Sequence, residues 1–159
     1  MSRRILVGQL SEARENYCGI GTRKTKLKLN RFATTDPRAS AFRLALEIED
    51  CSTQAKKYFG EWKDKKYAEK SELILKLVRL CQDHGWTFGK HDSKGFPRWI
   101  VYFELPNCEQ ISFHTNLKTP EDIPDYEKDW DGKRNSTLLK LEKAISEMFD
   151  EERNLPLNI

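Results

Sequence analysis

The stretch WIVYFELPNCEQISFHT, residues 99–115, decides the fold class of this chain. Apolar and polar side chains alternate on both sides of a Pro-Asn pair, and a period of two is typical of β-strands joined by a turn. An antiparallel hairpin that pairs apolar with apolar side chains is preferred, because a slip of one residue would move every side chain to the other face. The predicted apolar face carries Trp99, Val101, Phe103, Leu105, Ile111 and Phe113.

The opposite face of this hairpin is predicted to be polar. A phenol, a carboxylate, an amide, a hydroxyl and an imidazole on adjacent strands are groups that could bind a ligand or transfer a proton. The ordinary alternative is the solvated face that many antiparallel sheets present. The candidate ligand-binding residues on this face are Tyr102, Glu104, Gln110, Ser112 and His114.

The segments before the hairpin indicate another strand and two helices. Residues 86–91 alternate like a strand, and a turn at 92–95 joins them to the hairpin in a three-stranded meander. Asp36-Pro37 is a helix start signal, and apolar residues at helical spacing predict a helix from 37 to about 59. The apolar residues of 37–50 also alternate, so a strand there is the alternative. A second helix is predicted to end at Gly85.

The remaining segments complete the predicted architecture. Ser136 can cap a last helix, which runs to about residue 150 and packs on the apolar face of the sheet. Residues 1–31 form a basic arm or edge strands, because Leu27 and Leu29 alternate with lysines, and residues 117–135 form an acidic loop. The fold class is therefore α+β, an antiparallel three-stranded meander packed against two or three helices in a single domain of 159 residues.

Composition and motifs restrict the classes of function. The chain has no apolar run of roughly 18 residues and no secretory leader, which predicts a cytosolic protein without membrane contact. It has no Walker sequence, nucleophile elbow, HExxH or dinucleotide fingerprint, so no cofactor is expected and catalysis is the less favoured class. The cysteines lack the close pairs of a zinc site, so we expect no structural zinc and four thiols: Cys18, Cys51, Cys81 and Cys108.

Charge is unevenly distributed along the chain. Residues 1–31 hold eight basic and two acidic side chains, whereas residues 119–159 hold six basic and eleven acidic ones. Such a basic segment can contact a polyanion or be attracted to the acidic end of the same chain. The lysines at 63, 65, 66 and 70 are interleaved with acidic residues and are predicted to form a solvated helix face. The candidate nucleic-acid-binding residues are Arg23, Lys24, Lys26, Lys28 and Arg31.

A second polar cluster follows the sheet. Asp129 and Asp131 flank Trp130, and with Glu104 and His114 they could hold a hard divalent metal ion. The alternative is that Trp130 fills the core and Asp131 caps local backbone.

Three short motifs in this region resemble a known group of proteins. Gln110-Ile-Ser-Phe-His114, Pro124-x-Tyr126 and Trp130-Asp131-Gly132 are similar to motifs of small uncharacterised phage and bacterial proteins. That group often has a glycine at the position of Glu109 and a histidine at the position of Lys133. The resemblance implies a phage or mobile-element origin.

These observations lead to three hypotheses about function. The first is a small non-enzymatic recognition protein. Its expected partner is a host protein, including a defence-related one, or a nucleotide-like ligand. The second is a metal-dependent phosphodiester hydrolase that uses Glu104, His114, Asp129 and Asp131. The third is a nucleic-acid-binding protein that uses the basic segment from Arg23 to Arg31.

Overall fold

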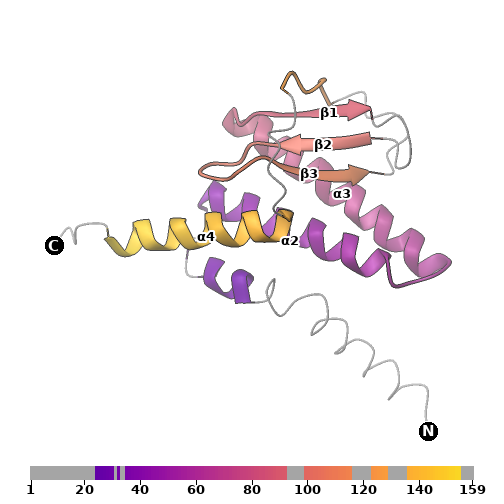
Figure 1. Ribbon diagram of the computed structural model, residues 1–159, viewed down its shortest axis with the longest axis horizontal. Helices are drawn as coiled ribbons and strands as arrows, with labels where there is room; N and C mark the ends of the chain where they lie inside the picture. Colours follow the sequence, from indigo (N-terminus) through magenta and orange to yellow (C-terminus); the bar gives the residue numbers. More distant parts are fainter. Residues whose placement is uncertain are drawn as a thin grey trace, which may run out of the picture.

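The computed structural model describes residues 24–30, 32, 35–92, 99–115, 123–128 and 136–154. Of residues 152–154 it describes the backbone alone. Its order of elements is α2 (Pro37–Ala55), α3 (Glu61–His84), β1 (Phe88–Asp92), β2 (Trp99–Phe103), β3 (Ile111–Thr115) and α4 (Thr137–Asn154). In Figure 1 the sheet lies above α4, and α3 passes behind the sheet. The predicted α+β class is confirmed.

The sheet has the predicted order and register. Its strands follow one another as β1-β2-β3, and both pairs are antiparallel. Val101 pairs with Phe113 and Phe103 with Ile111, so the apolar side chains share one face as expected. The turn between β2 and β3 has Pro106 and then Asn107 with a φ of 54°, the pattern of a type II turn. The N–H of Cys108 closes it by donating to the carbonyl of Leu105 at 3.2 Å.

Local signals define the ends of α2 and α3. The carboxylate of Asp36 accepts a hydrogen bond from the N–H of Arg38 at 2.9 Å, and Pro37 occupies the first turn, where its missing N–H has no intrahelical partner to lose. The strand alternative for residues 37–50 is therefore wrong. The helix ends at Ala55, somewhat before the predicted residue 59. Gly85 has a φ of 69° and ends α3 in the left-handed conformation, as predicted.

The core lies between the helix pair α2–α3, the inner face of the sheet and α4. α4 contacts α2 and β3, so it packs against a helix as well as against the sheet. Lys140 of α4 donates from its ammonium to the carbonyl of Gln110 at 2.6 Å, and the hydroxyl of Thr137 donates to the carbonyl of Ser112 at 3.4 Å. These bonds satisfy carbonyl groups along the free edge of β3, which blocks that edge from pairing with another strand.

The strand predicted near residues 24–32 is wrong in its described part, because residues 24–29 are helical. Thr25 and Leu29 are buried, whereas Leu27 is 60% exposed. Burial at positions four apart is the helical period, and in a strand Leu27 and Leu29 would share one face. Residues 1–23 and Arg31 lie outside the described residues. Within the described ranges, no helix is long and apolar enough to cross a membrane.

Candidate functional site

The five candidate residues of the polar face lie where the sequence places them. Tyr102 pairs with Ser112 and Ile100 with His114, so these side chains leave the sheet on the side opposite Val101 and Phe113. Glu104 and Gln110 continue the same alternation beyond the ends of β2 and β3.

Part of the loop that the sequence predicts at residues 117–135 crosses this face. Residues 123–128, here called the strap, run beside β1, where Lys90 donates its N–H to Pro124 at 2.8 Å and accepts from Tyr126 at 2.9 Å. The strap begins at Ile123, which is fully buried. Its Tyr126 ring stacks on the ring of Tyr102 with centroids 4.8 Å apart.

The strap contacts three of the five candidate residues on the polar face. Besides the Tyr102 stack, the amide of Gln110 donates to the hydroxyl of Tyr126 at 2.6 Å, and the ammonium of Lys128 lies 2.9 Å from the carboxylate of Glu104. Tyr102 is buried as a result, and this burial raises the pKa of its phenol. The face is therefore largely a packing surface for the strap, and Ser112 and His114 are the candidates on its other part.

At that remaining part of the face, the imidazole of His114 does not itself supply a positive charge. Partial desolvation of the imidazole, which stays exposed on one side, and secondarily the positive charges of Lys70 and Lys56 lower the pKa of His114 below its usual value. At neutral pH the ring is consequently uncharged. A neutral imidazole beside Ser112 offers hydrogen bonds without attracting a phosphate.

Glu104 and His114 lie far apart on the polar face. His114 pairs with Ile100, and Glu104 lies four residues farther along the chain. Four residues of extended chain span about 13 Å, so both side chains would have to extend toward each other to reach one ion, and the Glu104 carboxylate is already paired with Lys128. Asp129 and Asp131 lie outside the described residues. Within the described ones, no group of three or more His, Cys, Asp and Glu side chains is arranged to hold a metal ion.

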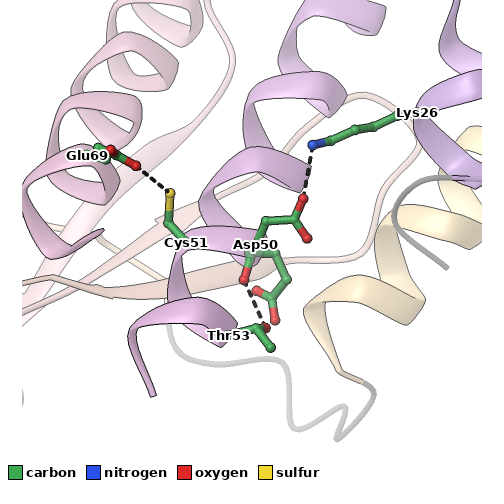
Figure 2. Close-up of polar contacts among 6 residues, drawn as sticks. Lys26, Asp50, Cys51, Thr53 and Glu69 are labelled. Atoms are coloured by element: carbon green, nitrogen blue, oxygen red, sulfur yellow. Dashed lines mark hydrogen bonds and ion pairs between the residues drawn. The ribbon is translucent and has the colours of Figure 1, made fainter. Parts of the chain in front are cut away.

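Two lysines of the basic segment, residues 23–31, contact the helices. Figure 2 shows Lys26 reaching Asp50 of α2, with 3.0 Å between the ammonium and the carboxylate. Lys28 lies 3.5 Å from the hydroxyl of Ser146 on α4. These contacts attach residues 24–29 to the helices, so Lys26 and Lys28 help hold the fold together. Lys24 is exposed, and Arg23 and Arg31 fall outside the described residues.

Polar side chains also line the contact between α2 and α3. The thiol of Cys51 donates to the carboxylate of Glu69 across the two helices at 4.0 Å (Figure 2). Lys70 is only 7% exposed, which corrects its predicted place on a solvated face. Burial lowers the pKa of Lys70 to about 8, although Glu49 opposes this shift. Burial likewise raises the pKa of Glu49.

Among the described residues, the most exposed large apolar side chain lies where α2 turns into α3. Residues 56–66, here called the tip, contain five lysines and two acidic residues, a formal net charge of +3. Phe59 is 90% exposed and Trp62 is 49% exposed. The ring of Trp62 lies 6.1 Å from that of Tyr58 and 5.4 Å from the ammonium of Lys65. Lysines interleaved with solvent-facing rings are the combination that binds single-stranded nucleic acids.

Sequence reasoning missed the tip, although a signal was present. The stretch KKYFGEWKDKK combines lysines with three aromatic residues. The charge pattern of this stretch alone predicts a solvated helix face, because acidic residues are interleaved with the lysines. Exposure of Phe59 and Trp62 follows from the turn between the helices, which the charge pattern does not reveal.

Comparisons with protein-family models, curated proteins and solved structures find no match to this chain. The resemblance carried by the motifs between Gln110 and Gly132 stays a prediction, as does the phage origin that it implies.

Proposed function

We propose that this chain is a non-enzymatic recognition protein that binds nucleic acid through the tip. The observation that carries the proposal is the cluster of five lysines around an exposed helix connection. Side chains in such a place can approach a phosphate backbone without rearrangement of the core. Figure 1 supports this geometry, because the α2–α3 connection lies at the end of the molecule opposite the C-terminal end of α4.

The tip is favoured over the two surfaces that the sequence suggests. The strap covers much of the polar face, and the lowered pKa of His114 leaves the imidazole there uncharged at neutral pH. In the basic segment, Lys26 is paired with Asp50. At the tip, by contrast, Lys56, Lys57 and Lys65 are all exposed. Lys63 and Lys66 are half-buried, and the ammonium of Lys66 lies 3.1 Å from the carboxylate of Glu69.

Binding by these lysines should depend strongly on salt. Each phosphate that a lysine neutralises releases condensed counterions, so log K falls with log salt by about 0.7 per contact for a single strand. Three exposed lysines therefore account for a slope of about −2. Affinity should be modest and nearly independent of base sequence, because phosphate contacts carry no sequence information.

The test compares two triple variants of equal charge. Lys56→Gln, Lys57→Gln and Lys65→Gln remove three cations from the tip, and Lys76→Gln, Arg79→Gln and Lys143→Gln remove three exposed cations elsewhere. Affinity for a labelled oligonucleotide is measured by fluorescence anisotropy over a range of salt concentrations. The tip variant should lose most of the affinity and of the salt slope, while the control keeps most of both.

Two results would contradict the proposal. Equal losses in both triple variants would mean that overall charge, and no particular surface, attracts the oligonucleotide. A tip variant with unchanged affinity, together with loss of binding in a Lys24→Gln, Lys28→Gln variant, would place the site on the basic segment instead.

A further inference from the structure

We infer that the ligand of the tip is single-stranded and that an unpaired base stacks on Phe59, with Trp62 offering a second ring. This inference rests on the proposed function and specifies the form of nucleic acid. It starts from the exposed aromatic side chains, whereas the proposed function starts from the lysines.

Phe59 is placed for an external partner. It is 90% exposed, so its ring contributes almost nothing to the core, and it takes part in no ring stack with the other described residues. Tyr58, its neighbour, is half-buried and contacts Trp62 instead. An almost fully exposed phenylalanine next to two lysines presents both faces of a flat apolar ring to solvent.

The backbone after Phe59 fixes this exposure. Gly60 has a φ of 62° and a ψ of −135°, a conformation that residues with a Cβ rarely adopt, and it precedes the first residue of α3. A Cβ at this position would meet no atom within 4 Å, so backbone conformation and not crowding accounts for the glycine. The turn at Gly60 directs the chain into α3 and leaves the Phe59 ring outside the helix pair.

The lysines identify a nucleotide chain as the stacking partner. The ammonium of Lys65 lies 5.4 Å from the centre of the Trp62 ring, so a positive charge sits beside an aromatic face. A nucleotide has the complementary arrangement, a flat base joined to an anionic phosphate. In a duplex the faces of the bases are already stacked on each other, so only a single strand can offer a base to Phe59.

The same residues disfavour insertion into a lipid bilayer. An interfacial helix needs a broad apolar face, but the residues of α3 that share the face of Trp62 are charged: Lys65, Lys66 and Glu69. The exposed apolar surface of the tip is therefore restricted to two rings. This extent suits contact with one or two bases.

The experiment measures binding of wild type and variants to a short thymidylate single strand and to a duplex of equal length. Phe59→Ala should lower affinity for the single strand about tenfold to one-hundredfold, the loss typical of one base–aromatic stack. Phe59→Tyr should keep most of it, because the ring remains. Leu139→Ala, which removes a side chain 51% exposed on α4, is the matched control and should change nothing. Duplex binding should be weaker and insensitive to Phe59→Ala.

The outcomes separate the inference from the proposed function. One outcome is that single strand and duplex bind with equal affinity, that Phe59→Ala changes neither affinity, and that the triple lysine variant of the tip lowers both. In that case the tip binds by charge alone, and this inference is wrong. If neither nucleic acid binds at low salt, both proposals fail. Binding to vesicles of phosphatidylserine and phosphatidylcholine that requires Phe59, without oligonucleotide binding, would also overturn both.

Discussion

Among single residues, Lys70 has the surroundings least suited to its charge. The sequence predicts it on a solvated face, because Asp64, Glu69 and Glu72 are interleaved with the lysines of α3. The structure places it on the buried stripe of that helix, four residues before Ile74 and seven before Leu77. Its spacing could have indicated this burial, since a lysine stem can pack on an apolar face while its charge lies at the margin.

The lowered pKa of Lys70 predicts how stability depends on pH. Its value falls from 10.5 to about 8 because of burial, so between these two values the unfolded chain binds more protons than the folded one. The free energy of unfolding should therefore rise as pH increases from about 8 to 10.5. At neutral pH Lys70 is charged although it is buried. Its pKa shift corresponds to a loss of about 3 kcal/mol in the free energy of unfolding.

Lys70→Met should remove both effects. The variant should be more stable than wild type at neutral pH by about 1–3 kcal/mol, because a thioether packs like the lysine stem without a charge to desolvate. Its stability should also lack the Lys70-dependent rise between pH 8 and 10.5. Urea unfolding at several pH values measures this, with Lys76→Met on the exposed face of α3 as the control. Loss of stability at neutral pH would mean that attraction to Glu49 outweighs the burial penalty.

At the scale of elements, what the sequence predicts well depends on local patterns. Asp36-Pro37 begins α2, Gly85 ends α3, and Pro106-Asn107 forms the turn between β2 and β3. Residues 24–29 were mispredicted because six residues are too few to separate a period of two from one of 3.6. The strap could not be predicted, because its position depends on contacts of Tyr126 with residues far away in the sequence.

The close approach of the strap to β1 leaves no room for a side chain on Gly89. A Cβ on Gly89 would lie 2.5 Å from the Cα of Tyr126, and a backbone atom cannot move aside as a side-chain end does. Gly89→Ala should therefore lower the free energy of unfolding by about 1–3 kcal/mol, the usual penalty of overpacking. Thermal unfolding measures this, with Ser112→Ala on the same face as a nearly neutral control. An equally stable Gly89→Ala variant would show that the strap does not lie on β1.

At the scale of the whole molecule, the opposite charges of the two ends of the chain do not identify the site. The basic segment uses Lys26 to pair with Asp50, and its Lys28 lies beside Ser146 of α4, so part of its charge serves the fold. The candidate site could be predicted only in part. The register that places Ser112 and His114 on one face follows from the alternation in β2 and β3. The exposed rings of Phe59 and Trp62 depend on how two helices pack, which no local pattern specifies.

The central claim is that this protein contacts nucleic acid with residues 56–66, and chemical-shift mapping tests it most directly. A short single-stranded oligonucleotide is titrated at low salt into protein labelled with nitrogen-15. The account predicts that the largest shifts occur at the backbone amides of the tip and at the indole N–H of Trp62. Shifts confined to Ser112 and His114, or to residues 24–29, with the tip unchanged, would contradict it.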